Sequence, residues 1–336
     1  MVVDTEISAA DQLTPNLIHP AALSQTERVN LETCRASLWA SEVQVDPWPH
    51  FEVDDVLPPD VYAKVMENWP ETEAFDNLPS LVPGQEMHYI IVEDGRQPST
   101  MSESKAAFWR EFTDAWAYPL VLANLEKFVW QTALRFDGFL SRVSIQTFNL
   151  MHHGPDYAGQ DPHNHYNHNV NWLFTFLIYV GDETDPGAGT GLHRIVDNDW
   201  YLKDLRALDY TVPFGSPMQG TALSRRSEFR GNKLISMIDS PVTLHSGTPP
   251  ATPPTGLNRR IIRFHVGVPN EDIERVYGCS RQDFLKHFSE QSVEGRMREG
   301  ILRDINISRL STNPNKHREL TAETQLVLEA RPPLAG

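Results

Sequence analysis

Apolar and polar residues follow two different patterns along this chain. Between residues 139 and 268, apolar runs of strand length succeed one another, separated by clusters of Gly, Pro, Asn and Asp. These runs lie at 143–150, 172–180, 233–238 and 261–268. Several strands joined by long loops, with few helices between them, favour an antiparallel β-sandwich or barrel.

The residues before this region have helical spacing instead. From about residue 102 to 136, apolar side chains recur every three or four positions, with an interruption near Pro119. Upstream, an alternating segment at 48–57 predicts a strand, and Pro59 is placed to begin a helix. Helical spacing returns around 283–288 and 292–306. We therefore predict a mainly β fold with flanking helices.

The predicted organisation is a single domain spanning residues 1–336. It consists of an N-terminal extension at 1–45, an entry strand and packing helices at 46–138, a catalytic β core at 139–269, and C-terminal helices with a tail at 270–336.

Charge and cysteine content restrict the partners and the compartment. The chain has 29 basic and 45 acidic residues, a formal net charge of −16, which argues against nucleic acid or an anionic membrane as the main partner. Cys34 and Cys279 are the only cysteines, so neither a disulfide framework nor a thiolate zinc site is indicated. No secretion signal or apolar stretch of membrane-spanning length is recognisable. We expect a cytoplasmic protein, and its oligomeric state is not predicted.

Histidines are the most informative residues. Five of the thirteen lie within residues 152–168, and His163 and His165 have the spacing that puts two side chains on one face of a strand. His245 ends a later apolar run. Neutral imidazole binds iron, zinc and copper well, so we predict a metal site formed by His163, His165 and His245. Asp161 has the same strand parity and is the alternative third ligand.

With these residues in view, the chain from 49 to 268 resembles the iron(II)- and 2-oxoglutarate-dependent oxygenases, whose fold is a double-stranded β-helix, a jelly roll like that of the cupins. The matching pieces are the Pro-His-x-His segment at 162–165, the strand at 174–180, the Gly-Thr segment at 189–192, the His-Ser-Gly segment at 245–247, and the Arg-rich strand at 259–264. The resemblance implies Fe(II), 2-oxoglutarate and O₂ as cofactors and co-substrates. It also implies C–H hydroxylation, here of a small molecule such as an amino acid or a natural-product intermediate.

One position departs from the family pattern. His165 stands where the family has a carboxylate ligand. Besides Asp161, two other interpretations remain open. A shifted register would put Asn167 in the motif, as in halogenating relatives that bind chloride on the metal. Alternatively, three histidines would hold the metal, as in cupin-type thiol dioxygenases.

Arginines after His245 are candidates for binding the co-substrate. Arg259 and Arg260 follow His245 by 14 and 15 residues, and guanidinium forms bidentate, charge-assisted pairs with carboxylates. Only one strand parity faces inward, and Arg260 is our first choice, with Arg259 second. The resemblance adds Tyr179 and Thr190 to the 2-oxoglutarate pocket.

Three polar residues precede the histidine segment. Arg142, Gln146 and Asn149 are candidates for substrate contact. Two competing functions remain. One is a three-histidine dioxygenase that needs no 2-oxoglutarate, and the other is a non-catalytic β-sandwich binding protein.

Overall fold

The structure is a computed structural model of the protein. It describes residues 22–44, 46–48, 50–71, 74–75, 85–88, 101–133, 143–154, 159–164, 171–197, 220–239, 243–247 and 259–268. The helices expected around 283–306, the tail, and His165, Asn167 and Arg142 lie outside the described residues.

The larger sheet has six strands, and each neighbouring pair is antiparallel. In spatial order the strands are β1 (His50–Val53), β9 (Leu234–Ile238), β4 (Asn171–Val180), β11 (Arg259–Val268), β3 (Ser144–His153) and β2 (Gln85–His88). The apolar runs predicted as strands correspond to β3, β4, β9 and β11, so these predictions are confirmed. β1 confirms the predicted entry strand.

Two smaller sheets complete the β structure. One has the order β10 (Leu244–Ser246), β6 (Gly191–Ile195) and β7 (Thr221–Arg226), and the other pairs β5 (Thr184–Asp185) with β8 (Phe229–Arg230). An isolated antiparallel bridge between His163 and His245 adds the segment around His163 to the free edge of β10. Residues far apart in the sequence are thereby joined at one sheet edge.

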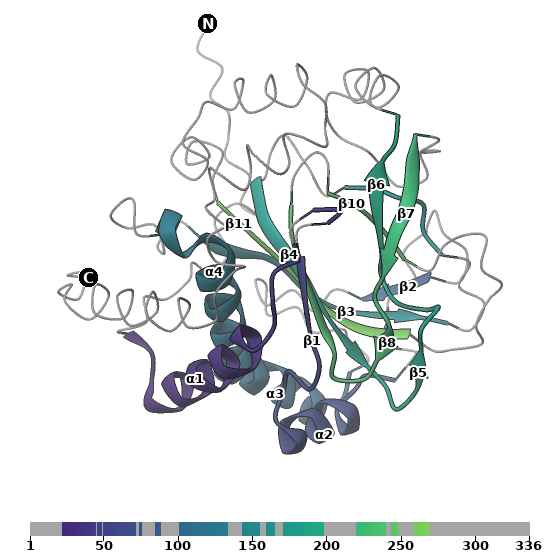
Figure 1. Cartoon of the computed structure of the whole chain (residues 1–336). Coiled ribbons are helices and arrows are strands. Elements are labelled where there is room, and N and C mark those ends of the chain that lie inside the picture. The colour runs from purple at the N-terminus through teal and green to yellow at the C-terminus, as the bar shows by residue number, and fades with distance from the viewer. Residues whose placement is uncertain are drawn as a thin grey trace, which may run out of the picture.

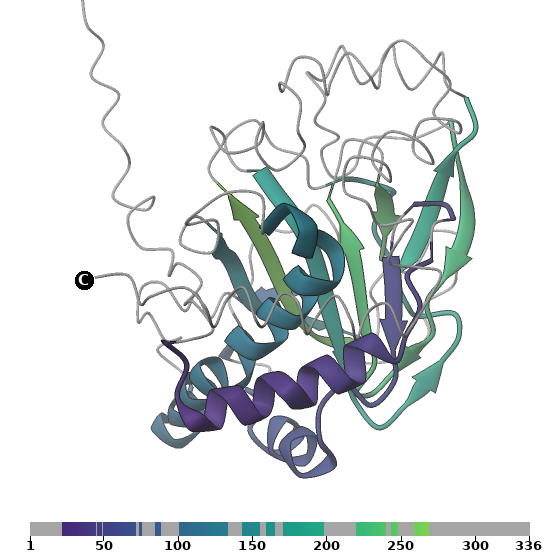
Figure 2. The ribbon, with the colours of Figure 1, turned by 60° about the vertical axis from the view of Figure 1, so that its left-hand side comes forward.

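Helices cover one face of the larger sheet, and β6 and β7 lie beyond its other face (Figures 1 and 2). The helices are α1 (Gln25–Trp39), α2 (Pro59–Glu67), α3 (Glu103–Phe112) and α4 (Tyr118–Ala133), with a π-helix at Thr113–Ala117 between the last two. The interruption expected near Pro119 is this π-helix, which ends just before the proline-containing first turn of α4. Within the described residues, no helix is both long and apolar enough to cross a membrane.

Helix α1 was not predicted within the N-terminal extension. Its start carries a capping box, in which the Ser24 hydroxyl accepts from the Glu27 amide and the Glu27 carboxylate accepts from the Ser24 amide. Leu31, Cys34 and Leu38 of this helix are buried in the core. The Ser-x-x-Glu pattern was the available signal for this helix, and scattered polar residues obscured it.

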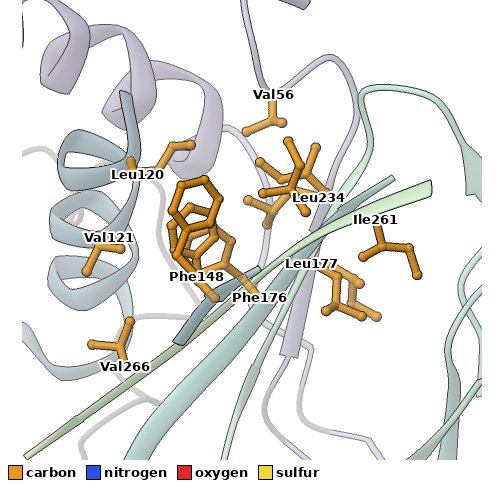
Figure 3. Packing of buried hydrophobic residues seen from close by; sticks show 14 of the residues in the cluster. Val56, Leu120, Val121, Phe148, Phe176, Leu177, Leu234, Ile261 and Val266 are labelled. Atoms are coloured by element: carbon orange, nitrogen blue, oxygen red, sulfur yellow. The ribbon is translucent and has the colours of Figure 1, made fainter. Parts of the chain in front are cut away.

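Alternation along the strands separates two layers of side chains. On the helix side, the Phe264 ring stacks between Phe148 and Phe176, with both centroid distances 4.5 Å, and Leu120 of α4 packs over this cluster (Figure 3). Ile261 and Leu177 point to the opposite side of the sheet (Figure 3). Because successive residues of a strand face opposite sides, the same strands build a helix-facing core and a second, inward face.

A buried lysine links α1 to α4. The Lys127 ammonium donates to the main-chain carbonyls of Leu38 and Ser41, at 2.5 and 2.8 Å, and so caps the C-terminus of α1. Its Nζ atom also lies 4.4 Å from the centre of the Phe51 ring. Burial lowers the pKa of Lys127 to about 7.

This lowered pKa predicts that the free energy of unfolding rises with pH above neutrality. Between about pH 7 and the ordinary lysine value of 10.5, the unfolded chain binds a proton at this position that the folded chain has lost. Stability then increases with pH, by at most about 1.4 kcal/mol per pH unit from this group. Urea unfolding of the wild type and Lys127→Met at pH 7, 8 and 9 measures the difference. If the free energy of unfolding changed equally with pH in both proteins, the lowered pKa of Lys127 would be contradicted.

Candidate active site

A pocket lies between the inward face of the larger sheet and the strands of β10 and β6. It has about 380 Å³ of empty space, part of it open to solvent. The larger sheet contributes Met151, His153, Leu177, Arg259, Ile261 and Arg263, and the opposite side contributes Gln160, His163, Thr190, His245, Ser246 and Gly247. Both histidines that the sequence placed far apart face this one pocket.

His163 and His245 are held together by their own main chains. Each amide donates to the other residue's carbonyl at 2.9 Å, which forms the bridge between the two segments. The imidazole centroids lie 4.5 Å apart, and the two residues are 3% and 5% exposed. The structure thus brings together two of the three imidazoles that were predicted to form a metal site.

The ring orientation indicates which nitrogen faces a ligand. Nδ1 of His163 lies 2.9 Å from the carbonyl oxygen of Asp161, and Nδ1 of His245 lies 3.5 Å from that of Thr243. A carbonyl partner fixes Nδ1 as the protonated nitrogen and Nε2 as the electron-pair donor. Burial, together with the nearby charge of Arg263, lowers the pKa of His163 to about 4. The imidazole is therefore neutral at pH 7, as metal binding requires.

Two residues were predicted as the third metal ligand, His165 and, as the alternative, Asp161. His165 lies outside them. Asp161, the alternative, is not among the pocket-lining residues, and the part of the chain that the structure describes holds no group of three His, Cys, Asp or Glu residues placed to bind a metal. Asp161 therefore contributes its main-chain carbonyl to His163 and does not complete a metal site with His163 and His245 in this arrangement.

The inward parity of β11 is opposite to the one expected. Arg259 and Arg263 line the pocket, whereas Arg260 does not. Arg260 shares the face of Ile262 and Phe264, which pack in the core on the helix side, and its charge acts on Tyr62 of α2. Of the two arginines predicted to bind the co-substrate, the second choice, Arg259, therefore lies at the pocket and the first choice, Arg260, does not, because the core takes the even-numbered residues of this strand.

Arg259 has a specific environment. It is 3% exposed, and its guanidinium carbon lies 5.9 Å from the ring centre of Tyr179 and 6.0 Å from that of Phe229. The Tyr179 hydroxyl donates to Thr190 Oγ1 at 2.7 Å and accepts from the Thr190 amide at 2.8 Å. Tyr179 thus supports both the arginine and Thr190, which lines the pocket.

Gly189 allows this arrangement of Thr190. A Cβ atom at Gly189 would lie 1.7 Å from the carbonyl oxygen of Ser227, so the segment before β6 passes the Ser227 main chain at a distance that only glycine permits. The amide of Ser227 donates to the Thr190 carbonyl at 2.9 Å. The main chain of Ser227 therefore fixes the positions of both Gly189 and Thr190.

Asn149 is the one candidate substrate residue whose side chain is described. It is fully buried, and its Oδ1 accepts from Nε of Arg263 at 3.0 Å, in agreement with the pairing of these residues across β3 and β11. The side chain of Gln146 and all of Arg142 lie outside the described residues.

Several pocket residues were not found by sequence reasoning. Arg263, His153 and Gln160 line the pocket but were not candidates. Arg263 was detectable, because it shares its strand parity with Arg259. Burial, followed by the charges of Arg259 and Arg263, lowers the pKa of His153 well below its usual value.

Comparisons with known proteins give only distant similarities. No protein-family model and no curated protein matches the sequence. Among solved structures, a prolyl 4-hydroxylase from Phytophthora capsici is 12% identical, with 89% of this chain and 94% of that chain covered and a TM-score of 0.42. A Pseudomonas putida prolyl-4-hydroxylase is 13% identical, covering 70% and 97%, with a TM-score of 0.38. An oxidoreductase of the 2OG-Fe(II) oxygenase family from Burkholderia pseudomallei is 12% identical, covering 70% and 89%, with a TM-score of 0.36. Similarity at this level does not assign the chain to a family.

Proposed function

We propose that this protein is a non-haem iron(II)- and 2-oxoglutarate-dependent oxygenase that hydroxylates a C–H bond of a small molecule. The observation that carries the proposal is one pocket that combines two buried, bridged imidazoles with a buried guanidinium, those of His163, His245 and Arg259. Two neutral nitrogen donors suit iron(II), and a buried cation suits the distal carboxylate of an oxo acid.

The strand order supports a double-stranded β-helix. In chain order, the segments β3, that of His163, β4, β6, β7, β9, β10 and β11 divide between two antiparallel four-strand arrays. These arrays are β9-β4-β11-β3 and β7-β6-β10 followed by the His163 segment. Two four-stranded sheets between which the chain passes repeatedly are typical of a jelly roll. This architecture brings His163, His245 and Arg259 to one interior.

The residues present fit a metal ion as its donors. His163 and His245 would hold it through Nε2, because their Nδ1 atoms face main-chain carbonyls. His165 is the proposed third ligand, since it follows His163 by two residues. When bound, iron(II) together with 2-oxoglutarate and O₂ supplies the oxidation of the substrate C–H bond.

Arg259 and Thr190 would bind and orient 2-oxoglutarate. The guanidinium is pre-positioned against two aromatic rings and has little conformational freedom left to lose. Thr190 Oγ1 accepts a hydrogen bond from the Tyr179 hydroxyl. The Thr190 O–H is therefore left to donate a hydrogen bond into the pocket. In the proposed complex, both would donate to the distal carboxylate, which has two oxygens to accept.

An anaerobic titration tests the proposal directly. The full-length apo-protein is titrated with iron(II) and then with 2-oxoglutarate while the visible spectrum is recorded. A weak charge-transfer band that requires both components is expected from bidentate chelation. A spectrum that does not respond to 2-oxoglutarate after iron(II) has bound would exclude chelation and favour the three-histidine dioxygenase.

The Arg259→Gln variant should bind 2-oxoglutarate about ten- to a hundredfold more weakly, as expected from loss of a charge-assisted hydrogen-bonded pair. The matched control is Arg260→Gln, one residue away on the opposite face of β11. Isothermal titration of the iron-loaded proteins under anaerobic conditions measures both affinities. Equal affinities in the two variants, or a larger loss in Arg260→Gln, would contradict the assignment of the clamp.

A further inference from the structure

A second arginine enters the pocket, and the structure gives it a different setting from the first. Arg263 is half-buried, lines the pocket, and lies four residues beyond Arg259 on the same face of β11. At the rise of a β-strand, their Cα atoms are about 13 Å apart. Arg259 lies against Tyr179 and Phe229, whereas Arg263 is bonded to Asn149.

We propose that Arg263, oriented by Asn149, binds an oxyanionic group of the primary substrate, so that the substrate class is small molecules carrying a carboxylate or a group of the same chemistry. This assignment rests on the proposed function, in which Arg259 takes the distal carboxylate of 2-oxoglutarate. Asn149 is a positioning residue in this scheme, and Arg263 makes the contact.

The charge of the pocket supports two bound anions. Two arginines line it, and none of its described lining residues is Asp or Glu. A cationic lining favours bound anions, because charges interact more strongly in a partly enclosed space than in water. Arg259 and Arg263 lie four residues apart on one strand, so an anion at each would have a position of its own.

Asn149 gives independent support. Its side chain is fully buried, and Oδ1 accepts from Nε of Arg263 at 3.0 Å, which fixes the plane of the guanidinium fork. Among the described residues, Nδ2 of the same amide has no hydrogen-bond partner. A buried donor of this kind is costly to leave unpaired. An oxyanion has enough lone pairs to accept from both the guanidinium fork and this amide.

The test uses the full-length protein, loaded anaerobically with iron(II) and saturated with 2-oxoglutarate. Acetate, sulfate and phosphate are titrated in turn and binding is measured by calorimetry, so that the preferred oxyanion is identified. We expect at least one of them to bind the wild type and the Arg260→Gln control alike. Arg263→Gln should lower the affinity for that anion about ten- to a hundredfold. It should change the affinity for 2-oxoglutarate less than about threefold. Arg263→Lys, which keeps the charge without the fork, should fall between them.

Three outcomes would overturn the proposal. Anion binding that is equal in wild type and Arg263→Gln would show that Arg263 is not the contact. Anions that displace 2-oxoglutarate from the wild type would show that there is a single anion position. A loss of 2-oxoglutarate affinity in Arg263→Gln as large as in Arg259→Gln would mean that both arginines hold the oxo acid.

Failure of the proposed function has a different signature. If 2-oxoglutarate does not bind the wild type at all, the oxygenase proposal fails, and the same anion titration without 2-oxoglutarate still reports on Arg263. Circular dichroism of each variant shows whether it is folded. If Arg263→Gln is unfolded, Arg263→Lys and Asn149→Ala provide the comparison, and wild-type anion affinity in both would contradict the proposal.

Discussion

Replacing His245 with alanine should abolish iron binding and lower 2-oxoglutarate-dependent turnover by more than about a hundredfold. Loss of residues that merely support metal ligands costs 10–100-fold in affinity or activity, and His245 is proposed as a ligand itself. His163→Ala should behave alike, because the two imidazoles face the same pocket with their centroids 4.5 Å apart. Iron content after anaerobic reconstitution and succinate formation are the two measurements.

A matched control separates loss of a ligand from loss of structure. His193→Asn removes an imidazole on β6, where His193 is paired with Leu244 and does not line the pocket. It should retain one equivalent of iron. A second readout is thermal: iron(II) binds the native state, so it should raise the melting temperature of the control and of the wild type, but not that of His245→Ala. An unchanged iron content in His245→Ala would refute the proposed metal site.

The third ligand is decided by the same measurement. His165→Ala is expected to lose iron as His245→Ala does. Asp161→Ala should retain it, since Asp161 supports His163 through its main-chain carbonyl, which alanine keeps. The opposite result would restore the carboxylate as a ligand and require a different arrangement of this segment.

The sequence predicted the strands of the site well because burial on both faces leaves a continuous apolar run. β4 and β11 pack against helices on one side and line the interior on the other, so their runs were easy to recognise. The shared site of His163 and His245 was predicted from residue type, and the resemblance to a known fold then supplied the arrangement of strands that would join them. Spacing alone carries no information about which distant segments meet.

The orientation of β11 could not be fixed from its sequence. Residues 259–263 read Arg-Arg-Ile-Ile-Arg, in which both parities carry an arginine and an isoleucine. The next residue, Phe264, determines which face of β11 points to the helices. Its ring fills the aromatic stack on the helix side, so Arg260 and Ile262, which share its parity, lie on that side too. Tertiary packing therefore determined which arginine reaches the pocket.

That stack gives Phe264 a large expected effect on stability. Its ring lies between Phe148 and Phe176, at 4.5 Å from each, with interplanar angles of 7° and 16°. All three rings are at most 1% exposed, and Phe148 and Phe176 lie beside Leu120 of α4 (Figure 3). Removing the middle ring leaves a cavity that two flanking strands and a helix cannot easily close, and truncations of this kind cost about 3–5 kcal/mol.

Phe264→Ala should therefore lower the free energy of unfolding by about 3–5 kcal/mol, whereas Phe264→Leu, which keeps more of the volume, should cost less. Urea denaturation at a temperature where all three proteins are folded measures the difference, with an unchanged m-value as evidence that only stability has altered. Because Phe264 faces the helices while Arg263 faces the pocket, 2-oxoglutarate affinity of the folded Phe264→Leu protein should equal that of the wild type. A loss of affinity without a loss of stability would mean that the two faces of β11 are not independent, and that the helix-side core positions the pocket arginines directly.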